Sequence, residues 1–328
     1  MRVIIRWSSS AATKSNRSPR LNRKTLAARE ARIRDLMRLA VGTPAGLAYA
    51  DSADLLDAIE KVARVESVLT RFPVVPRDQY FFQRERYLNP DSGESGFQRF
   101  DYPIVYPLAT APRTAILMEG FVETAKVMCF PDGWGMDLDR FRPECLAGPV
   151  AALRRMATCV FNRGARFPSL RRLPVVAFTG LPFGETGILT DADRDQFWKA
   201  FNLPVTEYFL GDRHEILARE CEAHTGLHID PMQAVFEVVD PETSELVITS
   251  LANSVFPVVR LASGLAGEVT EAPCACGAAG QRVINIRPLA QKFVLPRIRV
   301  RAAAVGLEDR AEEALPPPLA SIEDEWIT

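Results

Sequence analysis

The sequence predicts an α/β fold in three successive parts: a helical start, a layer of parallel strands with helices, and a β-rich C-terminal third. Three observations support this order. Leucines and alanines recur at helical spacing between residues 25 and 64. Apolar runs at 173–180 and 204–210 flank a helical segment, which is typical of a parallel layer. Two runs of alternating polarity surround a turn in "AVFEVVD-PETS-ELVITSL" (234–251), which indicates a hairpin.

Composition and charge narrow the class of protein. The chain has 328 residues, of which 47% are hydrophobic and 25% charged, as in ordinary soluble domains. Its net charge of −1 gives no overall attraction to nucleic acid or to a membrane surface. No apolar run approaches the ~20 residues that span a bilayer. Six cysteines are too few for a disulfide scaffold, so we expect a cytoplasmic protein with metal-bound or buried thiols.

The helical start follows a basic tail. Residues 1–24 are rich in Ser, Asn, Arg and Lys, so we expect a disordered tail, with a transit peptide or an anion-binding arm as alternatives. A helical segment is expected over 25–90. Its helices lie in "LAAREARIRDLMRLA" (26–40) and "ADLLDAIEKVARVESVL" (53–69), and "RFPVVPRDQYFF" (71–82) is expected to be extended and then helical.

The middle of the chain is predicted to be a shortened α/β subdomain at 91–205. We expect strands in "RTAILMEG" and "AKVMCF", a helix in "PECLAGPVAALRRMATCVFNRG" (143–164), a buried strand in "LPVVAFTG", and a helix in "TDADRDQFWKAFN" (190–202). A β-rich subdomain at 206–300 follows, with strand-like pieces in "FPVVRLA" (256–262), "GEVTEAP" (267–273) and "QRVINIR". The last segment, 301–328, is an acidic, Pro-rich tail.

A metal site is suggested by "PCACG" (273–277), where Cys274 and Cys276 lie too close to bridge each other but close enough to bind one ion. The segment "ECEAHTGLHID" (220–230) adds Cys221, His224 and His228. Three thiolates and one imidazole close a tetrahedron and leave no position for water, so the site would be structural. The set Cys221, His228, Cys274 and Cys276 fits zinc. His224 as the ligand in place of His228, or simply unligated cysteines, are the alternatives.

These two segments also resemble the C-terminal part of phenylacetate-CoA ligases, within the adenylate-forming (acyl-CoA synthetase) superfamily. "LPFGETG" (181–187) and "YFLGD" (208–212) resemble the family's Gly-Glu-Pro loop and its Tyr-Gly-Leu-Thr-Glu motif. The resemblance covers residues 25 to 290. It implies a truncated adenylate-forming N-terminal domain with a structural zinc, and it has no counterpart of the family's separate lid domain after Gly277.

The family makes an acyl-adenylate from a carboxylate and ATP, and the resemblance assigns candidate residues to that reaction. The phosphate loop corresponds to "DSGESG" (91–96), where Glu94 puts a negative charge beside the phosphates. Asp212 stands at the magnesium-binding acid, and Leu265 occupies the place of the ribose-binding aspartate. The nucleotide- or substrate-binding candidates are Ser92, Gly93, Gly96, Gly184, Glu185 and Tyr208, and the catalytic candidates are Asp212, Arg260 and His214.

The departures from the family's motifs leave two candidate functions. The first is a diverged protein that has lost ATP-dependent ligation and binds a small acyl or aryl carboxylate, its thioester, or a partner protein. The second is an active acid–thiol ligase, completed by a partner chain or a second protomer. Glu94 and Leu265 make binding of ATP and Mg²⁺ doubtful. Arg260 has a structural ion pair as its alternative role, and the alternative for His214 is a surface or helix-start position. Nucleophilic catalysis is disfavoured because no Gly-x-Ser-x-Gly elbow is present.

Overall fold

The computed structural model describes residues 23–42, 53–62, 65–88, 112–133, 135–163, 170, 174–252 and 256–289. They all belong to one compact unit. The expected tails at 1–22 and 301–328 and the loop "DSGESG" at 91–96 lie outside the described residues, and so do Ser92, Gly93 and Gly96. Residues 23 and 24, expected in the basic tail, instead begin helix α1 (Arg23–Gly42).

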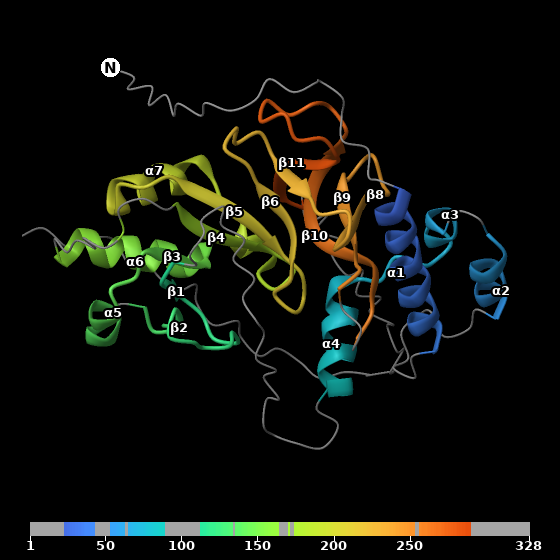
Figure 1. The fold of residues 1–328 in the computed structure, drawn as a ribbon, viewed down its shortest axis with the longest axis horizontal. Coiled ribbons are helices and arrows are strands. Elements are labelled where there is room, and N and C mark those ends of the chain that lie inside the picture. Colours follow the sequence, from blue (N-terminus) through green and yellow to red (C-terminus); the bar gives the residue numbers. More distant parts are fainter. Residues whose placement is uncertain are drawn as a thin grey trace, which may run out of the picture. The chain divides into compact units, whose positions relative to one another are not determined.

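One eleven-stranded sheet organises the described residues (Figure 1), in the order β2-β1-β3-β4-β5-β6-β7-β11-β10-β9-β8. Its first five strands are parallel, which confirms the predicted parallel layer. The remaining strands pair antiparallel, from β6 onward. The parallel strands are β1 (Thr114–Ile116), β2 (Val127–Cys129), β3 (Cys145–Pro149), β4 (Val175–Gly180) and β5 (Val205–Leu210). The antiparallel strands are β6 (Ile216–Glu220), β7 (Leu227–Ile229), β8 (Ala234–Val238), β9 (Glu245–Ser250), β10 (Val258–Thr270) and β11 (Arg282–Pro288).

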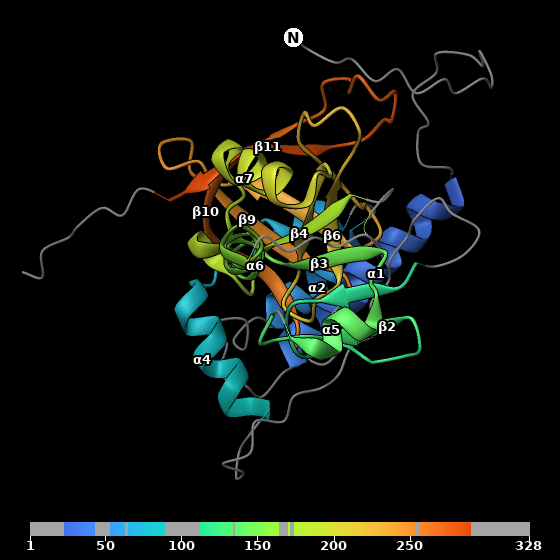
Figure 2. The same ribbon diagram turned by 90° about the vertical axis from the view of Figure 1, so that its left-hand side faces the viewer.

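Helices cover the two halves of the sheet differently (Figures 1 and 2). Helices α6 (Val150–Arg163) and α7 (Asp191–Phe201) pack with the parallel strands around buried residues such as Leu153 and Phe197. The N-terminal helices pack on the antiparallel half, where Ile33, Met37 and Tyr80 share a core with β10. They are α1, α2 (Ala53–Lys61), α3 (Glu66–Leu69) and α4 (Arg77–Leu88), and two short elements, α5 (Met136–Phe141) and the 3₁₀ turn η1 (Gly184–Gly187), complete the list.

The helix expected over 143–164 is wrong before Val150, because Cys145–Pro149 form strand β3 and α6 begins at Val150. The run is buried between β1 and β4, and burial on both faces favours a parallel strand whatever the local propensity. Gly148 permits this packing, because a Cβ there would lie 2.8 Å from the Cβ of Leu117.

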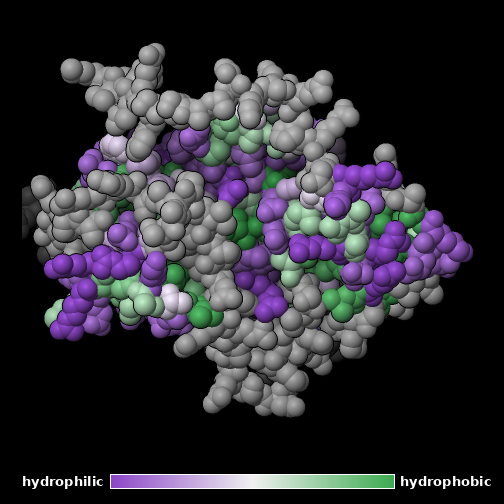
Figure 3. Space-filling model, in the orientation of Figure 1, coloured by the Kyte–Doolittle hydropathy of each residue, from purple (hydrophilic) through white to green (hydrophobic). Residues whose placement is uncertain are grey.

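The expected pieces at 256–262 and 267–273 are joined in one 13-residue strand, β10. Gly264 has a φ of +74°, a value that costs glycine little, so the strand bends there without ending. None of the helices in the described residues is long and apolar enough to cross a membrane. Hydrophilic and hydrophobic residues are interspersed on the face seen in Figure 3.

Candidate metal centre and ligand site

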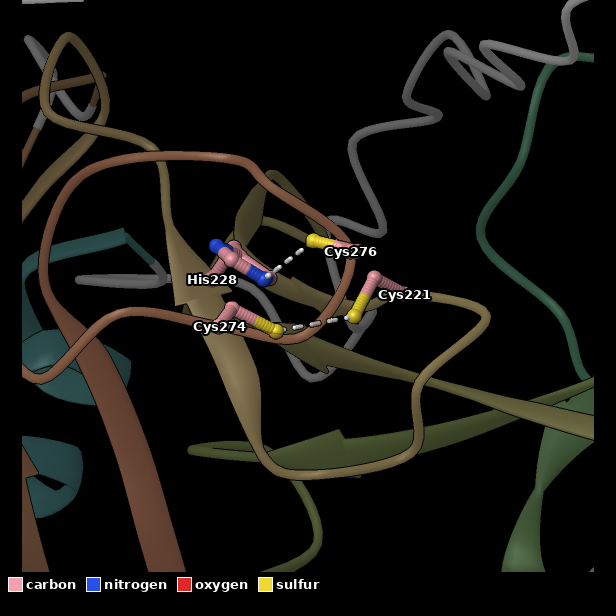
Figure 4. A group of neighbouring side chains, drawn as sticks. All are labelled: Cys221, His228, Cys274 and Cys276. Atoms are coloured by element: carbon pink, nitrogen blue, oxygen red, sulfur yellow. Dashed lines mark hydrogen bonds between the residues drawn. The ribbon is translucent and has the colours of Figure 1, made fainter. Parts of the chain in front are cut away.

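Four ligand-type side chains from the antiparallel half converge at one point (Figure 4). Cys221 follows β6, His228 lies in β7, and Cys274 and Cys276 lie in the turn between β10 and β11. All four ligand atoms lie within 4.8 Å of one another. The Cys221 and Cys274 Sγ atoms are 3.6 Å apart, and His228 Nε2 lies 3.4 Å from Cys276 Sγ. A cluster of three sulfurs and one nitrogen at these separations could hold a metal ion.

Strand pairing brings these distant ligands together. His228 lies opposite Arg219 of β6 and opposite Arg282 of β11, so β7 is held between the two strands that lead to the cysteines. The β6–β7 turn needs Gly226, because its φ is +120° and a Cβ there would lie 2.7 Å from the carbonyl oxygen of Val283. In the other turn, Gly277 N–H donates to the carbonyl of Cys274 at 2.9 Å and folds the Cys-x-Cys segment back on itself.

The cysteine thiols of the cluster differ in their local environment and therefore in their pKa. The Thr225 hydroxyl lies 3.3 Å from Cys274 Sγ, and its hydrogen bond, together with the backbone N–H of Cys276, lowers the pKa of Cys274 to about 5. Burial raises the pKa of Cys221 to about 11. His224 lies apart from the set, since its Nδ1 contacts Glu220 Oε1 at 2.9 Å. None of the six cysteines forms a disulfide.

Asp212, expected beside magnesium, is held inside the protein by two residues of α4. Its side chain is 2% exposed, and Oδ2 lies 2.6 Å from Arg84 Nε. The hydroxyl of the buried Tyr80 donates to the same oxygen at 3.2 Å. Burial raises the pKa of Asp212, although Arg84 and Tyr80 counteract this. One carboxylate oxygen therefore already has two internal partners.

His214 and Glu215 follow in the β5–β6 turn. The His214 ring stacks on Phe121 with 5.0 Å between centroids, so the ring is half-buried against an aromatic side chain and not on an open surface. Burial, with a contribution from Arg84, lowers the pKa of His214 to about 4, which leaves it neutral at pH 7. The Glu215 carboxylate accepts hydrogen bonds from the Ser250 hydroxyl at 2.5 Å and from the Arg213 amide at 2.8 Å.

Arg260 is engaged in the core. Its Nη1 donates to the carbonyl oxygens of Thr70 and Phe72 at 3.0 and 2.5 Å, and its Nε contacts Glu237 at 3.2 Å. These contacts tie β10 to the segment after α3. They agree with the structural ion pair weighed as this residue's alternative role.

The remaining nucleotide or substrate candidates are mostly covered. Tyr208 is 6% exposed and packs in the cluster that contains Phe178. Gly184 is buried, with a φ of +55°, and a Cβ there would lie 3.3 Å from the guanidinium of Arg77. Glu185 is exposed. Leu265 is 1% exposed and belongs to the core between the sheet and the N-terminal helices.

A cavity of about 600 Å³ opens beside the metal cluster. Cys221 and His228 form part of its wall, and none of Gly184, Glu185, Tyr208 or Asp212 lines it. The other lining residues come from β6 and the turn before it, from the end of β7 and the segment after it, and from the turn after Cys276: Glu215, Ile216, Ala218, Arg219, Glu220, Ile229, Asp230, Pro231, Gln233, Ala278 and Ala279. Sequence reasoning missed this cavity, because its wall is built from segments that are distant in the sequence.

Sequence reasoning also missed the α4 residues Tyr80 and Arg84, which contact Asp212, and Arg77, which lies beside Gly184. Tyr80 precedes Asp212 by 132 residues. No spacing or motif connects the two segments, so only the tertiary structure reveals the contact.

Comparison with known proteins gives structural matches only: no family model and no curated protein sequence matches the chain. A structure of 2-hydroxyisobutyryl-CoA ligase in an open conformation, with 2-HIB-AMP and CoA, is 14% identical, covers 86% of this chain and 76% of its own, and has a TM-score of 0.58. The same ligase in its thioesterification state is 14% identical, with coverage of 84% and 70% and a TM-score of 0.59. At this identity the likeness establishes the fold alone: the chain shares the α/β fold of 2-hydroxyisobutyryl-CoA ligase.

Proposed function

We propose that this chain is a diverged member of the phenylacetate-CoA ligase-like group that has lost ATP-dependent acyl-CoA ligation. It retains a structural zinc ion and binds a small acyl or aryl carboxylate, its thioester, or a partner protein. The observation that carries the proposal is the internal pairing of Asp212. The proposed setting is the cytoplasm, whose reducing conditions keep the zinc-binding thiols available.

The pairing of Asp212 opposes magnesium binding. Mg²⁺ takes oxygen ligands in a demanding octahedral geometry and is usually held by carboxylates together with substrate phosphates. Asp212 would have to leave a 2.6 Å contact with Arg84, and separation of such a pair leaves a charge without compensation. In addition, the positive charge of Arg84 already neutralises the carboxylate that a cation would need.

Two further contacts support loss of nucleotide binding. Leu265, at the place of the ribose-binding aspartate, is core and has no acceptor for hydroxyl groups. The Arg77 guanidinium packs on Gly184 and donates to the carbonyl of Leu181 at 2.9 Å, so it fills space over the Gly-rich loop. The first change would remove the acceptor for the ribose hydroxyls, and the second would reduce the space for a nucleotide beside the Gly-rich loop.

The proposed zinc follows from the donor set. Zn–S bonds of about 2.3 Å in a tetrahedron place two sulfurs about 3.8 Å apart, close to the 3.6 Å between Cys221 and Cys274. Four protein ligands fill the coordination sphere, so bound zinc would stabilise the fold and would not activate water. The role of Cys221, His228, Cys274 and Cys276 is to join two strand turns.

Calorimetry with Mg²⁺–ATP tests the loss of nucleotide binding. The purified protein, assayed for bound zinc, is titrated with Mg²⁺–ATP alone and again with a pool of aryl and acyl carboxylates. We expect no saturable heat with ATP up to millimolar concentration. Saturable micromolar ATP binding would overturn the proposal and support the alternative, an active acid–thiol ligase completed by a partner chain.

A further inference from the structure

Arg282, at the start of β11, is a buried arginine that joins the two turns of the metal cluster. It is 6% exposed. Its Nη1 donates to the carbonyl oxygen of Thr225 at 2.6 Å and lies 2.9 Å from the Thr225 hydroxyl oxygen. Its Nη2 donates to the carbonyl oxygen of Ala272 at 3.1 Å. One guanidinium therefore contacts both polypeptide segments that carry metal ligands.

Both hydrogen-bond partners of Arg282 lie close to metal ligands in the sequence. Thr225 lies between Cys221 and His228, and Ala272 lies two residues before Cys274. The Thr225 hydroxyl also lies 3.3 Å from Cys274 Sγ. A continuous set of hydrogen bonds thus runs from Arg282 through Thr225 to a ligand sulfur. Such outer contacts fix the orientation of metal ligands.

Charge provides a second argument. Zn²⁺ with three thiolates and a neutral imidazole carries a net charge of −1. Burial of a charge is costly unless a neighbouring charge or hydrogen bonds compensate it. Among the described residues, no carboxylate forms an ion pair with Arg282. The loaded cluster would supply the missing negative charge, and Arg282 would offset the excess charge of the cluster.

We propose that Arg282 is a positioning residue of the metal site, which holds the two ligand turns together and compensates the charge of the thiolate cluster. Thr225 transmits this effect by donating its hydroxyl hydrogen to the Cys274 sulfur. This inference rests on the proposed metal site. It adds two residues that the ligand spacing does not reveal.

The test compares metal affinity in matched variants of the full chain. Arg282→Met removes the charge and the hydrogen bonds, and Arg282→Lys keeps only the charge. Arg287→Met is the control, because Arg287 lies on the same strand and is exposed. Zinc affinity is measured by competition with a chromophoric chelator. We expect about 10- to 100-fold weaker binding in Arg282→Met, a smaller loss in Arg282→Lys, and no change in Arg287→Met.

Cobalt spectroscopy separates positioning from general loss of stability. Thr225→Val removes the hydroxyl but keeps the backbone carbonyl that Arg282 contacts, so it tests the sulfur contact even if Arg282→Met does not fold. We expect Thr225→Val to shift the sulfur-to-cobalt charge-transfer band of the Co²⁺-substituted protein, and Thr225→Ser to restore it.

The outcomes distinguish this inference from the proposed function. If the wild-type chain binds about one zinc but Arg282→Met binds it as tightly as Arg287→Met does, the positioning role is wrong and the zinc site stands. An unchanged cobalt spectrum in Thr225→Val would show that the Thr225 hydroxyl does not act on the Cys274 sulfur. If the wild-type chain binds neither zinc nor cobalt, both the zinc site and the role of Arg282 are wrong.

Discussion

At the scale of single residues, the sequence predicts the metal-ligand role of Cys274 but does not predict the buried environment of Asp212. The thiols are identified by their own spacing and by the resemblance, and the structure brings all four predicted ligands together. Asp212 was also placed by resemblance, but its environment depends on Arg84 and Tyr80 of α4. Residue type, local spacing and the resemblance together predict the cluster, whereas the partners of a buried charge cannot be predicted from the sequence.

Replacement of Asp212 tests its structural role. Asp212→Asn leaves Arg84 beside an uncharged amide in a largely buried position, so we expect a loss of about 3 kcal/mol in the free energy of unfolding. Urea unfolding followed by circular dichroism measures it.

The control for this experiment is Asp137→Asn, because Asp137 forms an exposed pair with Arg140. A change within about 0.5 kcal/mol is expected there. Equal stability of the two variants would show that Asp212 is not held by its internal partners and is available to a ligand.

At the scale of secondary-structure elements, α7 was predictable and β3 was not. Thr190 accepts a hydrogen bond from the Asp193 amide, and Asp193 accepts one from the Thr190 amide, a reciprocal cap that lies within one turn of the sequence. The strand Cys145–Pro149 has no such local signal. Its conformation follows from pairing with β1 and β4, so its neighbours in space, not its own residues, decide it.

The cap of α7 gives a pH prediction. Burial opposes the charged form of Asp193, but hydrogen bonds from Arg154 and Thr190 outweigh it and lower the pKa to about 2 from 3.8. Because the folded-state pKa lies below the unfolded one, the stabilisation is present above pH 4 and is lost between pH 4 and about pH 2. Asp193→Asn should therefore lower the free energy of unfolding by about 1–2 kcal/mol at pH 7, and the difference should shrink toward pH 2.

Unfolding curves from pH 7 to pH 2 check this, with Asp191→Asn as the control from the same helical turn. A difference between the wild type and Asp193→Asn that stays constant across the acid range would contradict the assigned cause.

At the scale of the whole fold, the three-part order predicted from the sequence is confirmed for the described residues, but the sequence did not show that one sheet unites them. Strand β5 pairs with β4 on one side and with β6 on the other, and this joins the parallel and antiparallel halves. The metal ligands all lie on the antiparallel side. Pairing between distant strands depends on tertiary contacts, so local patterns could not predict it.

Metal removal should consequently affect one half of the sheet. We expect a chelator to increase amide hydrogen exchange in β7 and β11, which carry or flank the ligand turns. Exchange in β3 and β4, which pack with α6, should stay unchanged. Hydrogen–deuterium exchange by mass spectrometry measures both regions in one sample. Equal deprotection of both regions, or of neither, would contradict a local structural role for the metal.

We propose that the fold shared with 2-hydroxyisobutyryl-CoA ligase persists here without ATP-dependent ligation. Exchange of radiolabelled pyrophosphate into ATP, assayed with a panel of small acyl and aryl carboxylates, tests it most directly, because it detects acyl-adenylate formation without CoA. We expect exchange at the level of a protein-free blank for every carboxylate, from protein that carries its metal. Carboxylate-dependent exchange above that blank, abolished in Asp212→Asn, would show that this chain is an active ligase and that the proposed loss of ligation is wrong.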